Sequence, residues 1–356
     1  MKILIICSSL EKGKDGVGDY SRKLGAWLSQ RSFKTQILAF NDKFLLNREF
    51  RSDSISRFSS GLNLKLRQKK LQEIIDAFEP DILFLQYVPY GFHRKGIPLK
   101  LAKVLGSIRT SGKWFIMIHE PYIGGSLGAR EKLVQFAQKK ALKRLVKKTK
   151  PKRVFTSIKK YERALADIQI VSSILPLFGN IQFSEMGADR DDSVLTGVYF
   201  GAPPKKQNYQ FFRQGLIEIS VKYKLKIYIC GKTNDSDFKS YLRSSFVSKN
   251  IELIDLGELS EEKLSQLFRK VNFGIARIAP DLIGKSGSAI SLLEHGVKLW
   301  IPLAKTQEEI AREVLFRPNL CFARLSDLTE DESNPKLISN LDKVGKLLIN
   351  QINIVA

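Results

Sequence analysis

Short apolar runs rich in β-branched residues alternate with stretches of helical spacing along nearly the whole chain, and the alternation is interrupted once near the middle. The first series of runs lies at 3–8, 35–40, 81–86, 114–119 and 153–157. The second series lies at 194–200, 225–230, 251–256, 273–277, 298–302 and 320–323. Strands that alternate with helices pair in parallel through βαβ crossovers. The sequence therefore predicts an α/β protein with one parallel sheet in each half.

The interruption is the polar, acidic segment 184–193, and it divides a chain of 356 residues into parts of ordinary domain size. We expect a doubly wound, Rossmann-like domain over 1–182, a linker at 183–193 and a second such domain over 194–334. Helical spacing in the second domain occurs at 207–222, 236–247, 260–270, 287–296 and 306–315. An amphipathic helix at 336–352, within 335–356, is expected to pack back toward the first domain. Two such domains facing each other would form a cleft beyond the carboxyl ends of their strands.

The charge of the chain is concentrated in its first half. The whole chain carries 59 Lys and Arg against 36 Asp and Glu, a net charge of +23. Residues 1–180 hold 35 of these basic residues and 14 of the acidic ones, a net charge of +21. This asymmetry predicts an anionic partner for the first half, which is a membrane surface, a phosphorylated acceptor or a nucleic acid. Solvated surface charge is the simpler alternative.

The cysteines and the hydropathy indicate a cytoplasmic protein without a membrane span. Cys7, Cys230 and Cys321 are odd in number, far apart and embedded in apolar runs, which is typical of buried, reduced thiols. No stretch reaches the roughly 20 apolar residues needed to cross a bilayer. The first apolar run follows Met1 and Lys2 directly and lacks the small-residue cleavage site of a signal peptide.

The segment 284–296, Gly-Lys-Ser-Gly-Ser-Ala-Ile-Ser-Leu-Leu-Glu-His-Gly, has the pattern of a phosphate or sugar site at a helix N-terminus. Lys285, Ser286, Gly287 and Ser288 offer a cation, hydroxyls and backbone N–H groups to an anion. Glu294 would lie about two turns into the helix that follows. An ordinary junction with a serine cap and a glycine stop is the alternative.

A glycine loop follows the first strand, with Gly16, Val17, Gly18 and Asp19 before a helix. A dinucleotide-binding motif would need a third glycine, where the chain has Ser21, and a tighter turn than this loop provides. In favour of that motif, Asp42 falls near the position of the motif's acidic residue. We favour a flexible loop whose amides and Asp19 approach a ligand. A loop that only shapes the turn is the alternative.

Polar side chains follow other strands of both halves. In the first half these are Gln86 and Tyr87 after the third strand, and His119 and Glu120 after the fourth. A histidine at the end of a buried parallel strand, beside a carboxylate, is a candidate for a functional group. In the second half, Lys205, Lys206 and Arg277 follow strands and could neutralise a diphosphate, although such cations are often only solvated. The histidines and cysteines have no metal-ligand spacing.

These features together resemble the nucleotide-sugar glycosyltransferases of the two-domain GT-B fold, in particular the large retaining group-one family. The resemblance is carried, in order, by Gly16-Val17-Gly18-Asp19, His119-Glu120-Pro121, Leu175-Pro176-Leu177-Phe178-Gly179-Asn180, Leu256-Gly257-Glu258-Leu259 and 284–296. It covers nearly the whole chain, but each motif is loose. It implies that the first domain binds the acceptor, that the second binds the nucleotide sugar, and that no metal or other cofactor is needed.

The resemblance also implies roles for individual residues. His119 and Lys285 would act in catalysis. The residues that would bind the donor are Gly16, Val17, Gly18, Lys205, Lys206, Arg277, Ser286, Gly287, Ser288 and Glu294. The residues that would bind the acceptor are Asp19, Gln86, Tyr87 and Glu120. Glu294 resembles the second glutamate of the family's paired-glutamate motif, a ribose ligand. The first glutamate of that pair is replaced by Ser286, and the family's arginine falls near Ala202. Cations such as Lys285 and helix amides would then stabilise the leaving diphosphate.

The segment 130–153 gives the basic first half a specific interpretation. It places Leu133, Phe136 and Leu145 among eleven cations, a pattern that suits a helix lying on an anionic membrane. The alternative is that the apolar stripe packs on the sheet. We therefore expect a glycosyltransferase that acts on a lipid-linked or cell-surface glycan precursor at the membrane. A catalytically silent scaffold or sugar-binding protein is the alternative function. Nucleic-acid binding is disfavoured because no recognisable nucleic-acid module is present.

Overall fold

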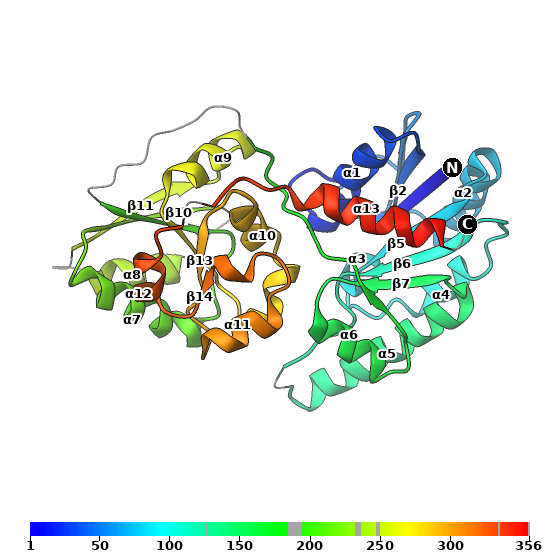
Figure 1. Cartoon of the computed structure of the whole chain (residues 1–356). Coiled ribbons are helices and arrows are strands. Elements are labelled where there is room, and N and C mark those ends of the chain that lie inside the picture. Colours follow the sequence, from blue (N-terminus) through cyan, green and yellow to red (C-terminus); the bar gives the residue numbers. More distant parts are fainter. Residues whose placement is uncertain (126, 184–193, 232–235, 247–249, 334, 355–356) are drawn as a thin grey trace. The chain divides into compact units, whose positions relative to one another are not determined.

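The structure is a computed structural model, and it describes residues 1–125, 127–183, 194–231, 236–246, 250–333 and 335–354. The chain divides into two compact units. The first unit comprises Met1–Leu175 and Leu341–Ala356, and the second comprises Pro176–Asn340 (Figure 1). Of the expected linker, 184–193 lies outside the described residues.

The first unit is built on an eight-stranded sheet with the order β3-β4-β2-β1-β5-β6-β7-β8. Its strands are β1 (Lys2–Cys7), β2 (Lys34–Asp42), β3 (Glu49–Arg51), β4 (Ile55–Ser59), β5 (Ile82–Tyr87), β6 (Lys113–Ile118), β7 (Arg153–Thr156) and β8 (Ser173–Ile174). All neighbours pair in parallel except β3 and β4, which are antiparallel. The central strand β5 is buried along its whole length, as expected for a parallel sheet covered on both faces.

The helices of the first unit are α1 (Gly16–Ser29), α2 (Leu64–Phe78), α3 (Pro89–Phe92), α4 (Leu99–Leu105), α5 (Ala129–Thr149), α6 (Lys159–Ala166) and α13 (Asn340–Asn353). The last of these, α13, packs beside α1 (Figure 1). There Trp27 donates a hydrogen bond to Asp342, and a Cβ atom on Gly345 would collide with the Trp27 ring. Arg31 adds an ion pair to Asp342 at 2.7 Å.

The second unit has a six-stranded, wholly parallel sheet with the order β11-β10-β9-β12-β13-β14. Its strands are β9 (Leu195–Phe200), β10 (Leu225–Cys230), β11 (Ile251–Gly257), β12 (Phe273–Ile275), β13 (Lys298–Trp300) and β14 (Cys321–Phe322). Its helices are η1 (Lys206–Asn208), α7 (Tyr209–Ser220), α8 (Ser236–Phe246), α9 (Glu261–Lys270), η2 (Pro280–Lys285), α10 (Gly287–Glu294), α11 (Gln307–Glu313), η3 (Pro318–Leu320) and α12 (Leu325–Glu330). One apolar core contains residues of α7, α8 and α12, and the other contains residues of α9, α10 and α11.

The expected fold class is confirmed, because both halves are parallel α/β units. Every strand expected in the second half is present, although β12, β13 and β14 are shorter than the apolar runs that predicted them. The short strands β3, β4 and β8 were not predicted. Of these, β3 is exposed and has no apolar alternation, and β8 has only two residues. The three cysteines are free and buried, as expected.

Candidate functional site

In the second unit, the carboxyl ends of β9 and β12 mark the place where the sheet order reverses. The helix after β9 joins one core and the helix after β12 joins the other, so the two connections leave the sheet on opposite faces. Ligands of open parallel sheets bind at such a point. The last paired residues are Tyr199 and Ile275, so Gly201 and Arg277 each lie two residues beyond the end of the ladder. This places Arg277 at the sheet position where a bound ligand is expected.

Arg277 has an incompletely satisfied guanidinium group. The side chain is half-buried, and its Nε atom is buried without a hydrogen bond within the described part of the chain. No carboxylate forms an ion pair with Arg277 among those same residues. A buried donor without an acceptor is costly, and a bound anion would remove that cost.

The N-terminus of α10 lies at the same place. Ser286 is its N-cap: the Ser286 hydroxyl accepts a hydrogen bond from the amide of Ala289 at 3.3 Å and contacts the Ser288 hydroxyl at 3.0 Å. A Cβ atom on Gly201, whose φ is +113°, would lie 3.5 Å from the Ser288 hydroxyl oxygen. Helix N-termini favour anions, so Ser286, Ser288 and the amide of Gly287 complement Arg277.

The three predicted lysines differ in how exposed they are. Lys205 precedes η1 and is exposed, and Lys206 forms an exposed ion pair with Asp237 at 3.5 Å. Lys285 is half-buried at the end of η2, directly before the cap of α10. Among these three, Lys285 is the one that chain connectivity holds beside the α10 N-terminus.

Glu294 lies at the opposite end of α10, and its carboxylate is already engaged. One oxygen accepts a hydrogen bond from the amide of Gly179 at 3.1 Å, and the other accepts one from the amide of Asn340 at 2.7 Å. The side chain is 3% exposed, and a Cβ atom on Gly179 would collide with it. The next residue, His295, is equally buried and contacts the Ser265 hydroxyl. The structure therefore does not bring Glu294 together with Ser286, Gly287 and Ser288, and its predicted role as a ribose ligand stays a prediction.

In the first unit, the ends of β5 and β6 bring Gln86, Tyr87 and His119 together. The amide of His119 donates to the carbonyl oxygen of Tyr87 at 2.9 Å, and its Nε2 contacts Oε1 of Gln86 at 2.9 Å. The ring of Tyr20 packs edge-on against the imidazole at 5.2 Å. The Nε2 of Gln86 is buried and forms no hydrogen bond with any residue that the structure describes. Gln86 is fully buried, so within the described residues its Nε2 is a donor that lies beside His119 without an acceptor. Glu120 follows as a half-buried residue.

Burial lowers the pKa of His119 to about 3, because the protein interior disfavours the imidazolium. Since this pKa lies below the unfolded value of about 6.5, the unfolded chain binds more protons at mildly acidic pH. We expect the free energy of unfolding to fall by about 2 kcal/mol from pH 7 to pH 5 through this histidine alone. Urea unfolding at the two pH values should show that His119→Asn loses this dependence, whereas the same change at exposed His93 keeps it. Equal pH dependence in the wild type and His119→Asn would contradict the prediction.

The glycine loop after β1 is held by an internal network rather than left open. The Asp15 carboxylate caps α1 by accepting hydrogen bonds from the amides of Val17 and Gly18 at 3.0 and 3.1 Å. Helix α1 begins at Gly16, and a Cβ atom on Gly18 would collide with the Ser9 carbonyl, so glycine permits the close packing of loop and helix. A donor phosphate would have to compete with Asp15 for these amides.

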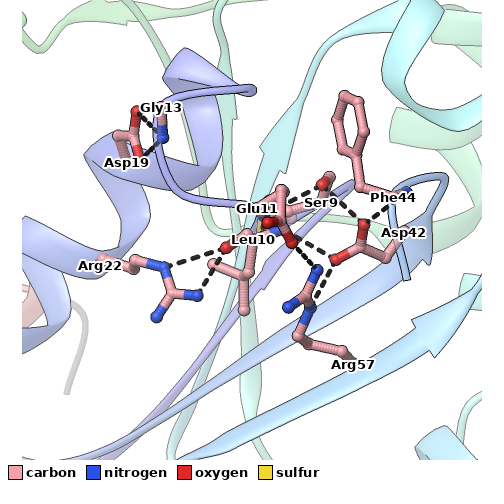
Figure 2. Close-up of polar contacts among 10 residues, drawn as sticks. Ser9, Leu10, Glu11, Gly13, Asp19, Arg22, Asp42, Phe44 and Arg57 are labelled. Atoms are coloured by element: carbon pink, nitrogen blue, oxygen red, sulfur yellow. Dashed lines mark hydrogen bonds and ion pairs between the residues drawn. The ribbon is translucent and has the colours of Figure 1, made fainter. Parts of the chain in front are cut away.

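Figure 2 shows the rest of this network, which centres on the fully buried Asp42. Its carboxylate accepts from Arg57 at 2.7 Å, from the Ser9 hydroxyl at 2.9 Å and from the amides of Leu10 and Phe44 at 3.1 Å. These donors hold the pKa of Asp42 below its usual range despite the opposing effect of burial. Asp42 thus organises the loop, which argues against a ribose-binding role in a dinucleotide site.

Asp19 accepts hydrogen bonds from the amide of Gly13 at 3.2 and 3.3 Å, so this carboxylate also stabilises the loop (Figure 2). The role predicted for Asp19 in binding the acceptor substrate stays a prediction. The capping residue Asp15 was missed, although an Asp immediately before the first residue of a helix is a recognisable cap signal. Within the described ranges, no three His, Cys, Asp or Glu side chains gather as metal ligands.

Comparison with known proteins shows similarity in structure but not in sequence. No protein-family model matches the chain, and no curated protein matches it. UDP-GlcNAc 2-epimerase from Neisseria meningitidis, solved with UDP-GlcNAc, has 10% identity and a TM-score of 0.56 over 99% of both chains. A putative UDP-N-acetylglucosamine 2-epimerase from Listeria monocytogenes has 11% identity and a TM-score of 0.52 over 99% of this chain and 88% of its own.

A lipopolysaccharide outer core galactosyltransferase, WaaB, has 14% identity and a TM-score of 0.52 over 85% of this chain and 80% of its own. At these identities the similarity concerns the fold. It agrees with the two parallel sheets described above, each with the strand order of a doubly wound domain. The chain therefore has the two-domain architecture found in GT-B glycosyltransferases and in UDP-GlcNAc 2-epimerases.

Proposed function

We propose that this protein transfers a sugar from a nucleoside-diphosphate sugar to an acceptor. The observation that carries the proposal is the position of Arg277, whose buried Nε has no acceptor within the described residues, at the β9–β12 reversal point of the second sheet. The N-terminus of α10 has its cap residue Ser286 at the same sheet edge. A guanidinium and helix amides together suit a diphosphate.

In the proposed reaction, the bond between the sugar carbon and a diphosphate oxygen breaks, and its electron pair leaves with the nucleoside diphosphate. The oxygen of an acceptor hydroxyl forms the new bond to the sugar carbon, and the hydroxyl proton passes to the departing diphosphate or to water. Negative charge develops on the departing diphosphate, and Arg277 with Lys285 would stabilise it. The hydroxyls of Ser286 and Ser288 would bind donor oxygens, while Lys205 and Lys206 would add charge from the neighbouring loop. This chemistry requires no metal, and we propose that none is used.

The first unit would bind the acceptor. His119 is neutral at physiological pH because burial lowers its pKa, so it would form hydrogen bonds to sugar hydroxyls without adding charge. The buried amide of Gln86 would fix the orientation of a hydroxyl beside it. The proposed acceptor-binding residues are therefore Gln86 and Tyr87, with Glu120 beside them.

The experiment is a screen of UDP-, ADP-, GDP- and CMP-sugars for thermal stabilisation, followed by proton NMR of the stabilising donor with and without a membrane extract as acceptor source. Transfer to an acceptor, or release of the sugar to water, supports the proposal. Formation of an epimeric nucleotide sugar without any acceptor would instead support the activity named for the Neisseria structure. Binding without turnover would favour the silent scaffold, and no binding would refute a nucleotide-sugar site.

We further propose that the acceptor is presented at an anionic membrane, on which α5 lies. In this helix Leu142 and Leu145 are buried against the sheet, whereas Leu133 and Phe136 are 71% and 67% exposed. Eight lysines and arginines share the helix with them. Exposed apolar side chains surrounded by cations suit insertion into the headgroup region of an anionic bilayer. Within the described residues, no helix is long and apolar enough to cross a membrane.

Liposome flotation tests this surface. We expect the protein to float with vesicles that contain anionic phosphatidylserine, and to stay in the bottom fraction when the vesicles consist of neutral phosphatidylcholine. The double change Leu133→Ser with Phe136→Ser should lower binding to anionic vesicles at least tenfold, because two apolar side chains no longer insert. Leu46→Ser is the matched control, since Leu46 is also exposed but lies outside α5. Equal binding to neutral vesicles, or no effect of the double change, would contradict the proposal, and a preference for DNA would favour a nucleic-acid partner.

A further inference from the structure

The first unit contains a cavity of about 510 Å³ that none of the predicted site residues lines. It lies beside the end of β2, where Phe40 forms part of its wall, and between the starts of α2 and α4. Its size is within the usual range for a small-molecule site. Most of the lining is apolar and includes Phe40, Leu64, Phe92, Ile97, Leu99 and Leu101.

Packing of aromatic rings connects the cavity wall to the residues proposed to bind the acceptor. Phe92 stacks on Tyr87, with ring centroids 6.2 Å apart and an interplanar angle of 12°. The Asn41 side chain also donates a hydrogen bond to the carbonyl of Gly91, which fixes α3 against the end of β2. A ligand in this cavity would therefore lie next to the strand end that carries Gln86 and Tyr87.

The buried cation in the lining is Arg67, which is only 8% exposed. Its guanidinium donates to three neutral oxygens, those of the Leu62 carbonyl, the Phe40 carbonyl and the Asn41 side chain. Within the part of the chain that the structure describes, Arg67 has no carboxylate partner and its Nη2 makes no hydrogen bond. A buried charge is normally paired, so a guanidinium without an anion beside an open cavity indicates a place for an anionic group.

The other residues that line the cavity also favour an anionic ligand. Lys100 also lines the cavity, and none of the lining residues is an aspartate or glutamate. Two cations match a phosphate, which carries a charge of roughly −1.5 to −2 at neutral pH, better than they match a singly charged carboxylate. The apolar walls favour a hydrocarbon chain behind that headgroup.

We propose that this cavity binds an apolar chain that carries a phosphate, with the chain between Phe40, Phe92 and Leu99 and the phosphate on Arg67 and Lys100. For the proposed transferase, the ligand class would be a phosphorylated lipid acceptor. That last step rests on the proposed function, whereas binding of an alkyl phosphate needs no nucleotide sugar. The two proposals can therefore fail separately.

Isothermal titration of the full-length protein with octyl phosphate, below its micelle concentration and without nucleotide sugar, tests the site. We expect one ligand per chain. Decyl phosphate should bind at least tenfold more tightly than octyl phosphate, because two more methylene groups are buried. Inorganic phosphate should bind at least tenfold more weakly than octyl phosphate, and octyltrimethylammonium should not bind. Equal binding of the cationic amphiphile, or no dependence on chain length, would overturn the proposal.

Two leucines of equal exposure give matched variants. Leu99 lines the cavity and Leu66 does not, and both are 38% exposed. Leu99→Trp should weaken octyl phosphate binding at least tenfold by filling the cavity, and Leu66→Trp should leave it unchanged. Lys100→Gln and Arg67→Gln should weaken binding of octyl phosphate while that of octanol stays the same. If Arg67→Gln does not fold, the leucine pair decides: equal affinities for the two variants would refute the site.

Discussion

Replacing Arg277 with methionine is expected to lower kcat/KM for the donor nucleotide sugar by about two to three orders of magnitude. Arg277 lies at the reversal point of the second sheet, and its buried Nε lacks a partner among the described residues. In the proposed reaction, negative charge would develop on the diphosphate beside this guanidinium, so loss of Arg277 should affect the transition state more than the bound donor. Methionine preserves most of the side-chain volume, which limits the effect on packing.

Steady-state kinetics and nucleotide titration measure this effect together. Arg324→Met is the matched control, because Arg324 is an exposed arginine just after β14 of the same sheet, away from the reversal point. We expect it to behave like the wild type. Lys285→Ala should lower turnover by a smaller factor of about ten, because Lys285 would be the second cation at the proposed diphosphate site. Unchanged turnover and unchanged affinity for the nucleoside diphosphate in Arg277→Met would show that the donor binds elsewhere.

Replacing Glu294 with alanine is expected to lower the free energy of unfolding by about 3 kcal/mol or more. Its two carboxylate oxygens accept hydrogen bonds from the amides of Gly179 and Asn340, and the side chain is buried. Alanine leaves both amides without acceptors and also creates a cavity. The two segments joined by Glu294 lie where the chain enters and leaves the second unit, at Pro176 and Asn340.

Urea unfolding followed by circular dichroism measures the loss, and Glu258→Ala, at an exposed glutamate, should change stability by less than about 0.5 kcal/mol. Glu294→Gln separates the two roles considered for this residue. If Glu294 is a structural residue, the glutamine variant loses stability while its nucleotide affinity is kept. A large loss of nucleotide affinity at unchanged stability would instead identify Glu294 as a ribose ligand.

The core strands were the most predictable part of the fold, because each of them is a short apolar run bounded by polar or glycine residues, whereas the short strands β3 and β8 carry no such signal. Helix α10 shows the limit of such reasoning. Its N-terminal serines and glycine were recognised, and Ser286 is its N-cap. The partners of Glu294 were not foreseeable, because Gly179 is 115 residues away in sequence. Arg67 was missed for the same reason: within α2 it is one of several cations, and its burial depends on Phe40 and Asn41 in another element.

The sequence by itself determined the α/β class, the two parallel sheets and the strand ends at which polar groups gather, because hydrophobic periodicity and turn residues are local properties. Only the tertiary structure decided which of those polar groups are already satisfied. Asp15, Asp19, Asp42 and Glu294 are engaged by backbone amides. The buried Nε of Arg277 and Nε2 of Gln86 lack acceptors within the described residues, and Arg67 donates only to neutral oxygens there. Hydrogen bonding is a pairwise property of atoms brought together by folding, so composition and spacing identify candidates but not their partners.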